Sequence, residues 1–284
     1  MIRLALLVGA FAPLMATDIA GSDLLAPVLT AGLAKVAPAG ATVDLAGTLA
    51  ARRGLAAGGV SLALVFARPD EPAPTAPGGV ACTPFPFARA AAVLAVHRSN
   101  PVGQIDLPAL AGVFSRETLN GAGNWNELPG GGRSDLITAA IHSPDGSYVR
   151  ELFQGVVLER KSFKETVRLD TPALQVRETL ASVSGALVLL PFPAAGDAKL
   201  LQVADGRPGR SATAYSPTEM NIYTGDYPLS LPLVLYVRED RRAAYGPAVR
   251  WLLSEEVATA LKSRGLTPTP PEVRGRLLQR LDTR

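Results

Sequence analysis

The sequence has one cysteine, Cys82, and only two histidines, His97 and His142. A protein metal site normally takes three or four ligands from histidine, cysteine and carboxylate side chains, so this composition gives no support to a metal centre. No Walker A loop and no Gly-x-Gly-x-x-Gly turn after an apolar run is present, so the sequence predicts neither a nucleotide site nor a cofactor. The lone cysteine is compatible with export without disulfides and with any other compartment.

Aromatic residues make up only 6% of the chain, and they do not alternate with basic residues. The formal net charge is +3, with lysine and arginine spread along the sequence, which is typical of a solvated basic surface rather than of a nucleic-acid interface. Charged residues are 19% and hydrophobic residues 48% of the chain, a balance that excludes a disordered protein. A chain of 284 residues then has room for one large domain or for two lobes.

Catalytic signatures are also scarce. A serine hydrolase triad can be drawn only from Ser147, His142 and an aspartate, and the Gly-x-Ser-x-Gly elbow of such enzymes is missing. Both histidines follow predicted strands, where an imidazole more often has a structural or hinge role. We therefore predict no catalytic residue and a protein that is not an enzyme, with a serine hydrolase as a remote alternative.

The N-terminal segment 1–16 combines one arginine, an apolar run of about a dozen residues and a small residue at its end. The run is too short for a membrane span, which needs ~20 apolar residues. We interpret the segment as a signal peptide, with the mature chain starting near Thr17 and the protein exported to the periplasm. The alternative is a buried first strand of a cytoplasmic protein.

Strand and helix patterns alternate between residues 18 and 66. A short apolar strand meets the turn Gly21-Ser22-Asp23, and a helix with apolar residues at helical spacing follows over 24–33. A second strand at 43–45 leads into a helix that begins at Gly47-Thr48, and a continuous apolar run at 60–66 suits a central parallel strand. This order predicts a doubly wound α/β lobe. The proline-dense segment 69–86 is predicted to be a surface loop.

A second alternating series begins with the apolar run 93–96. Asn100-Pro101 ends this strand, because the residue before a proline is disfavoured in the helical region, and Asp106 is a candidate N-cap for a helix over 107–114. Trp125 is expected to pack its loop onto the lobe below rather than to stack on a ligand. Further elements complete a second α/β lobe, with strands at 135–142 and 185–191 and helices at 149–156 and 174–182.

Several of these features occur together: Asn100-Pro101, the helix with Leu107, Leu110 and Phe114, the pair Asn124-Trp125, and the segment YPLSLPLVLYV at 227–237. In this combination the chain resembles the phosphate-type periplasmic substrate-binding proteins of ABC transporters. The resemblance implies a type 2 periplasmic-binding-protein fold, with two α/β lobes, each a mixed sheet flanked by helices, and two hinge crossings. It places lobe 1 at 17–95 and 199–284 and lobe 2 at 96–198. It also implies a monomer that captures a small anion, phosphate or another oxyanion, and delivers it to the permease of an ABC transporter.

Three helix starts should face the cleft between such lobes, because the carboxyl ends of strands in open α/β sheets point at that crevice. Unpaired N–H groups and the helix dipole make each start attractive to an anion. The expected ligand-binding residues at these starts are Ser22, Asp23, Thr48, Gly146 and Ser147. Taken singly, each hydroxyl is better explained by helix capping; their convergence at positions that match the family favours ligand binding.

The third helix start departs from the family pattern Arg-x-x-Gly-Ser-Gly-Thr-x-x-x-Phe. Gly146, Ser147 and Phe153 match, whereas the arginine, the second glycine and the threonine are replaced by Ser143, Tyr148 and Val149. An arginine binds an oxyanion through two charge-assisted hydrogen bonds, so its loss weakens a phosphate site.

The ligand is therefore less sharply predicted than the fold. Phe66 and Tyr148 make the expected cleft less polar, while Arg68, with Arg52 or Arg53, is a possible source of the missing charge. Tyr148 and Arg68 are additional candidate ligand-binding residues. Two hypotheses stay open: a transport binding protein for an oxyanion, or a degenerate relative with a different small ligand or a sensory or partner-binding role.

Overall fold

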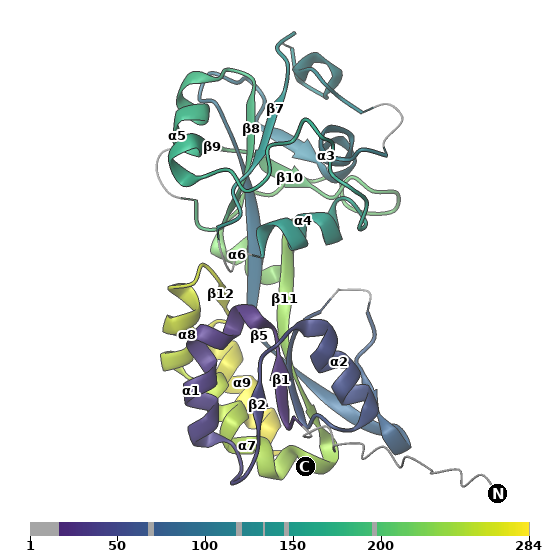
Figure 1. The fold of residues 1–284 in the computed structure, drawn as a ribbon, viewed down its shortest axis with the longest axis vertical. Helices are drawn as coiled ribbons and strands as arrows, with labels where there is room; N and C mark the ends of the chain where they lie inside the picture. The colour runs from purple at the N-terminus through teal and green to yellow at the C-terminus, as the bar shows by residue number, and fades with distance from the viewer. Residues whose placement is uncertain are drawn as a thin grey trace, which may run out of the picture.

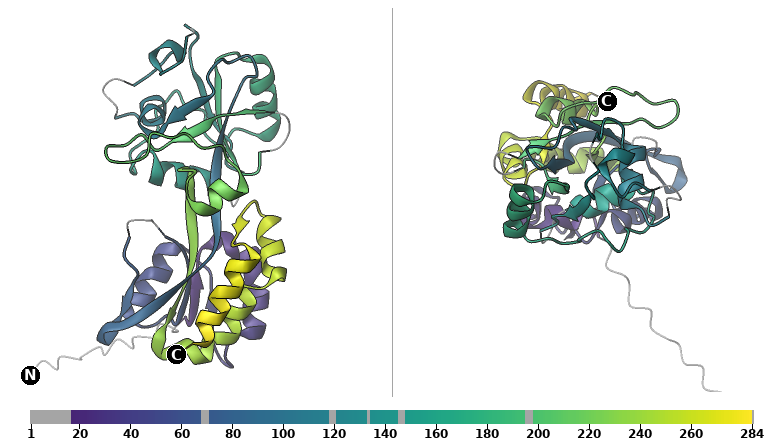
Figure 2. Two further views of the ribbon diagram at one scale, coloured as in Figure 1. Left: turned by 180° about the vertical axis from the view of Figure 1, so that it is seen from behind. Right: turned by 90° about the horizontal axis from the view of Figure 1, so that it is seen from above.

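The computed structural model describes residues 17–67, 71–117, 121–132, 134–144, 148–194 and 198–283. Figure 1 shows two lobes, one above the other, with β5 and β11 running between them, and Figure 2 shows the same separation from behind. Both lobes contain strands and helices, so the predicted two-lobed α/β fold is confirmed. None of the helices within these described ranges is long and apolar enough to cross a membrane.

The first lobe, the lower one in Figure 1, is built around β3 (Leu62–Phe66). β1 (Ile19–Gly21) pairs in parallel with β3 and with β2 (Val43–Asp44), and β11 (Ser230–Arg238) pairs antiparallel with β3. The first four residues of β3 are buried, as expected for a central strand covered on both faces. The helices of this lobe are η1 (Asp23–Leu25), α1 (Ala26–Val36), α2 (Thr48–Ala57), η2 (Pro77–Gly79), η4 (Glu239–Arg241), α7 (Arg242–Leu252), α8 (Glu255–Lys262) and α9 (Pro271–Asp282).

The second lobe, the upper one in Figure 1, contains the parallel pair β7 (Thr138–Ile141) and β8 (Ala186–Pro191). A separate parallel pair joins β6 (Gln104–Asp106) to β10 (Gln202–Ala204). Asp106 caps the following helix as predicted, because its side chain accepts a hydrogen bond from the Ala109 N–H at 2.8 Å. The helices of this lobe are α3 (Leu107–Phe114), η3 (Trp125–Glu127), α4 (Val149–Val156), α5 (Ala173–Ser182) and α6 (Glu219–Thr224).

One strand, β5 (Val80–Val96), passes through both lobes. Its residues 82–91 pair with β11, and its residues 92–96 pair with β8. The hydrogen-bonded strand order β2-β1-β3-β11-β5-β8-β7 is therefore continuous, although the strands lie in two lobes. The short strands β4 (Thr75–Ala76), β12 (Thr267–Pro268) and β9 (Lys199–Leu200) also pair with β5.

The prediction of a surface loop over 69–86 is wrong for its second half, because β5 begins at Val80. Pro84 and Pro86 lie inside the strand, although proline cannot donate a ladder hydrogen bond. The register between β5 and β11 shifts at Leu233/Val234, next to Pro86. Such a bulge accommodates a residue without an N–H group. The high proline content alone had predicted a loop here.

The predicted lobe boundary at residue 199 also needs correction. β9 pairs with the upper end of β5, and β10 pairs with β6, so residues 199–204 lie with strands of the second lobe. Pairing between segments a hundred residues apart leaves no local signal in the sequence. We propose that the chain returns to the first lobe at 225–229, between α6 and β11.

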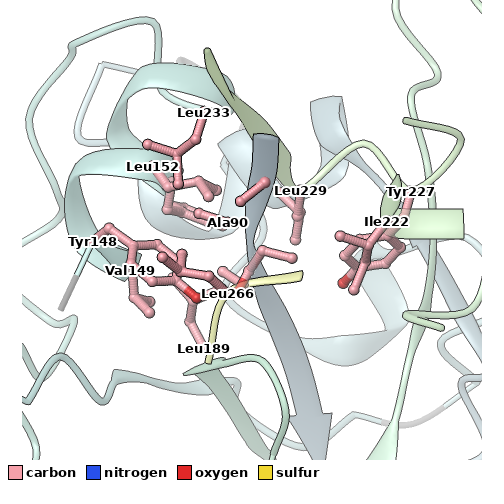
Figure 3. Close-up of a cluster of buried hydrophobic side chains, with 14 of the residues drawn as sticks. Ala90, Tyr148, Val149, Leu152, Leu189, Ile222, Tyr227, Leu229, Leu233 and Leu266 are labelled. Carbon is pink, nitrogen blue, oxygen red and sulfur yellow. Dashed lines mark hydrogen bonds between the residues drawn. The ribbon is translucent and has the colours of Figure 1, made fainter. Parts of the chain in front are cut away.

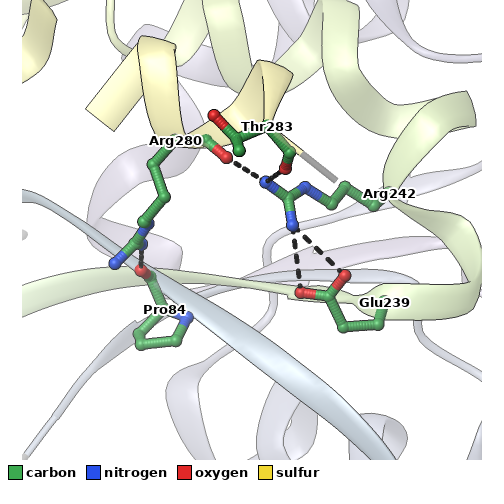
Figure 4. A network of polar contacts seen from close by, with 5 residues as sticks. All are labelled: Pro84, Glu239, Arg242, Arg280 and Thr283. Atoms are coloured by element: carbon green, nitrogen blue, oxygen red, sulfur yellow. Dashed lines mark hydrogen bonds and ion pairs between the residues drawn. The ribbon is translucent and has the colours of Figure 1, made fainter. Parts of the chain in front are cut away.

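Two arginines hold the C-terminal helix against the first lobe (Figure 4). Arg242, at the start of α7, donates hydrogen bonds to the carbonyl oxygens of Arg280 and Thr283. Arg280 donates to the carbonyl oxygen of Pro84, and its guanidinium lies 4.6 Å from the centre of the Phe85 ring. These contacts join α9 to the first part of β5.

Candidate functional site

Two of the predicted helix starts meet at the carboxyl end of β3. The Ser22 N–H donates to the Leu64 carbonyl oxygen at 2.8 Å, and the Phe66 N–H donates to the Thr48 hydroxyl oxygen at 3.3 Å. The two turns also bond to each other, because the Gly47 N–H donates to the Gly21 carbonyl oxygen at 2.8 Å. The structure therefore brings together the first two helix starts that the sequence predicted at one site.

Glycine is required at both turns. A Cβ atom on Gly21 would lie 2.7 Å from the Leu64 carbonyl oxygen, so a side chain there would push β1 away from β3. Gly47 has a φ of +141°, a conformation that residues with a side chain rarely adopt. The close approach of the two turns to β3 thus depends on these two glycines.

The backbone N–H of Ser22 does not have the ligand-binding role that was predicted for this helix start. It is 2% exposed, and its N–H is already bonded to Leu64, so this donor does not point at a ligand. Its hydroxyl lies 3.5 Å from a carboxylate oxygen of the exposed Asp23 and does not cap the helix. A ligand contact from Ser22 therefore has to come from its side chain.

Thr48 is the first residue of α2 rather than its cap, which is Gly47. Its hydroxyl oxygen accepts the Phe66 N–H, and a hydroxyl that accepts one bond still has its own O–H to donate. The first N–H groups of a helix have no partner within the helix. Thr48 therefore presents a side-chain donor together with the backbone donors of the first turn of α2.

Tyr148 reaches this place from the second lobe. It precedes α4 and is 7% exposed, and its ring lies 6.2 Å, centre to centre, from the ring of Phe66. Its hydroxyl is 3.3 Å from the carbonyl oxygen of Ala91 and 3.1 Å from that of Gly265. Burial raises the pKa of Tyr148 to about 12, so it is neutral at physiological pH. Figure 3 shows Tyr148 beside Val149 and close to Leu266, within an apolar cluster.

Arg52 does not supply the positive charge that the candidate site lacks in place of the family's arginine. This arginine donates to the Phe66 carbonyl oxygen at 3.2 Å and pairs with Glu71 at 2.6 Å, so its charge is already balanced. Arg53, one residue further along α2, is exposed. The predicted site residues Arg68, Gly146 and Ser147 lie outside the described residues.

A model of the PBP superfamily domain matches residues 14–256. The chain belongs to the PBP superfamily. No curated protein matches its sequence.

Solved structures show the same fold. A possible phosphate binding protein from Planctomyces limnophilus is 18% identical, with a TM-score of 0.74 over 93% of this chain and 96% of that one. PstS from Borrelia burgdorferi is 15% identical, with a TM-score of 0.68 over 89% and 98% of the two chains. An ABC-type phosphate transport receptor from Vibrio cholerae is 18% identical, with a TM-score of 0.63 over 89% and 99%. These similarities confirm the fold that the resemblance implied.

The histidines of this PBP superfamily protein are held by local contacts. His97 lies 2.8 Å from the Ser99 hydroxyl through one ring nitrogen and 3.2 Å from the Ala181 carbonyl oxygen through the other. The His142 Nδ1 atom lies 2.7 Å from the Thr171 carbonyl oxygen. Both rings thus tie the ends of strands to neighbouring segments, in line with the predicted structural role.

Trp125 has the packing role that the sequence predicted. Its side chain is 0% exposed, and its indole N–H donates to the Gly185 carbonyl oxygen at 3.1 Å in the second lobe. Glu127 accepts hydrogen bonds from the Gly123 and Asn124 N–H groups, which lowers the pKa of its carboxyl group. The Asn124-Trp125 turn is therefore a structural support of this PBP superfamily fold.

The sequence did not reveal the interlobe contacts of Tyr148, although the residue was named as a candidate. The Tyr148 hydroxyl bonds to the backbone carbonyl oxygens of Ala91 and Gly265. Every residue has such an oxygen, so the identity of these partners cannot be inferred from their side chains. The ion pair between Arg52 and Glu71 was missed for a similar reason, since Glu71 lies in the segment predicted as a loop. A local pattern does not report contacts between segments so far apart in the chain.

Proposed function

We propose that this protein is the substrate-binding component of an ABC-type transporter and holds a small anion between its lobes. The observation that supports this proposal is the meeting of helix starts from both lobes at one residue, Phe66. Thr48 of α2 bonds to the Phe66 backbone, and Tyr148, directly before α4, packs against the Phe66 ring. Helix starts offer unpaired N–H donors and a partial positive charge, which favour an anion.

Phosphate is the first ligand to test, because the fold is shared with proteins named for phosphate binding or transport. The donors proposed for it are neutral: the hydroxyls of Ser22, Thr48 and Ser147 and the N–H groups near Gly146. The arginine of the family pattern is Ser143 here, and Arg52 is paired with Glu71. A site of neutral donors also suits sulfate, molybdate and small carboxylates, so the proposal is a class of ligand rather than phosphate alone.

A second function is favoured by the packing of Tyr148. Its ring packs next to Phe66, and its hydroxyl bonds across to Ala91 and Gly265, so both its apolar and its polar part are already used in contacts within the protein. In this alternative the anion site is degenerate, and the protein binds a different metabolite or a sensory partner. The two functions differ in their response to oxyanions.

A thermal-shift screen separates these functions. We expect one of phosphate, sulfate, molybdate or a small organic acid to raise the melting temperature of the purified protein. A ligand at ~100 times its dissociation constant stabilises the folded state by roughly 2.7 kcal/mol, which is well above the noise of such a measurement. If every anion in the panel leaves the melting temperature unchanged, the degenerate function is correct.

The export of the protein is also a proposal, because segment 1–16 lies outside the described residues. Delivery to a transporter from outside the cytoplasm requires that this segment direct secretion and be removed. Mass spectrometry of the native protein should then find a chain that begins near Thr17. A chain that retains Met1 in the cytoplasmic fraction would contradict both the periplasmic location and the transport role.

A further inference from the structure

Arg89 is a half-buried cation without a carboxylate partner among the described residues, and it lies where β5 passes from one lobe to the other. It is paired with Pro232 of β11 on one side and with Thr267 of β12 on the other. One terminal nitrogen donates to the Ser230 hydroxyl at 3.2 Å, while the Nε–H is buried and has no hydrogen-bond partner. No carboxylate of the described ranges pairs with this guanidinium, and burial lowers its pKa.

A buried hydroxyl opposite Arg89 is also without a partner. Thr267 is 5% exposed, and its hydroxyl makes no hydrogen bond. Because Thr267 is directly opposite Arg89 in an antiparallel pair, the two side chains lie on the same face, with Cβ atoms about 4.5–5.5 Å apart.

Elements of both lobes flank the Arg89 guanidinium. The Ser230 hydroxyl that accepts its hydrogen bond donates to the Tyr227 carbonyl oxygen at 2.8 Å. Gly225, which ends α6, packs so closely that a Cβ atom there would lie 3.1 Å from a terminal nitrogen of Arg89. The helix α6 also contacts both β5 and β12. The end of α6 and the strand β12 therefore flank the guanidinium, which remains half-buried.

Buried donors of this kind are rarely left unsatisfied, since each costs free energy when it has neither a partner nor an ordered water. We propose that Arg89 and Thr267 bind a small monovalent anion of the size of chloride. An anion supplies the missing negative charge and accepts the Arg89 Nε–H and the Thr267 hydroxyl proton together. The close packing of Gly225 favours a single-atom anion over a tetrahedral oxyanion. This site is formed by residues other than those proposed for the ligand at Thr48, and it does not depend on that ligand.

Thermal unfolding in sodium chloride and in sodium gluconate at equal ionic strength tests the proposal. Gluconate is too large to enter the site, so only chloride should stabilise the wild-type protein specifically. We expect a saturable rise in melting temperature of about 5 °C at ~100 times the dissociation constant. Arg89→Met and Thr267→Val should each abolish the chloride-specific rise. Arg177→Met, an exposed arginine of α5, is the matched control and should keep it.

A crystal of the wild-type protein soaked in sodium bromide gives a second measurement that does not depend on how the variants fold. We expect an anomalous peak within contact distance of both the Arg89 Nε and the Thr267 hydroxyl. A crystal with only an ordered water at this place would contradict the proposal. An undiminished chloride effect in a folded Arg89→Met variant would contradict it as well.

Discussion

Tyr148 is the residue through which the second lobe touches the first at the candidate site. The family pattern has a glycine at this position, and the tyrosine adds a ring that packs on Phe66 and a hydroxyl that bonds to Ala91 and Gly265. A buried hydroxyl with good acceptors stabilises the arrangement that contains them by about 1 kcal/mol. One substitution therefore changes both the polarity of the site and the contact between the lobes.

The ionisation of Tyr148 gives a test at alkaline pH. Its folded pKa of about 12 lies above the ordinary value of 10.0, so the folded state holds the proton more tightly than the unfolded chain. This contribution to stability is complete below about pH 10 and is lost as the pH rises through about 12, to a total of a few kcal/mol. Tyr148→Phe should be less stable than the wild type by about 1 kcal/mol at pH 8, and it should lose less stability between pH 10 and 12.

Urea unfolding of both proteins at several pH values measures this difference. Tyr227 is also buried, which raises its pKa, but it is present in both proteins and cancels in the comparison. Equal losses of stability above pH 10 in the wild type and in Tyr148→Phe would show that Tyr148 is not buried between the lobes.

At the scale of the elements, the contact between α1 and α7 depends on the absence of a side chain at Gly32. A Cβ atom at this position would lie 2.0 Å from the indole ring of Trp251. Alanine is ordinarily favoured over glycine in a helix by up to about 1 kcal/mol, but a clash with a large ring in the helix contact outweighs this gain. We expect Gly32→Ala to destabilise the protein by about 1–3 kcal/mol.

Gly275 provides the matched control, because it lies in the exposed middle of α9 and a Cβ atom there would meet nothing within 4 Å. Gly275→Ala should stabilise the protein by up to about 1 kcal/mol through helix propensity alone. Chemical denaturation of the two variants checks the opposite signs. A stabilising effect of Gly32→Ala would mean that α1 and α7 are not packed as described.

Elements with a strong local signal were predictable from the sequence. The apolar run of β3, the Asp106 cap of α3 and the buried Trp125 all follow from side chains within a few residues. The first half of β5 was not predictable, because it contains Pro84 and Pro86, which argue against a strand, and the register shift next to Pro86 leaves no local signal in the sequence. The strands β9 and β10 were assigned to the other lobe because their pairing partners are remote in the chain.

The candidate site was also predictable only in part. The helix starts at Ser22 and Thr48 were predictable because glycine and hydroxyl residues mark them locally. Their hydrogen bonds to Leu64 and Phe66 were not, because a sequence pattern does not show which backbone groups are already used. The apolar character of the site was indicated by Phe66 and Tyr148, and the structure places these two rings next to each other.

At the scale of the whole molecule, the two lobes are joined where β5 and β11 run between them, with Tyr148 reaching from one to the other. In the proposed function, a ligand would be held by closure of the lobes through small changes at the crossings. The bonds of Tyr148 to Ala91 and Gly265 hold the two lobes together, and a ligand between the lobes would have to fit beside the Phe66 and Tyr148 rings. The account as a whole therefore depends on whether a small anion binds at this place.

Calorimetric titration of phosphate, and of any anion found by the screen, tests this claim most directly. The wild type should bind at least one of them, and Thr48→Val and Ser147→Ala should each weaken binding by about 5–150-fold, which corresponds to 1–3 kcal/mol for a lost donor. Thr48→Ser keeps the hydroxyl and should bind nearly as the wild type does. Ser143→Arg should bind phosphate more tightly, because an arginine adds two charge-assisted hydrogen bonds. Absence of anion binding in the wild type and in Ser143→Arg, or equal affinity of the wild type and Thr48→Val, would contradict the account.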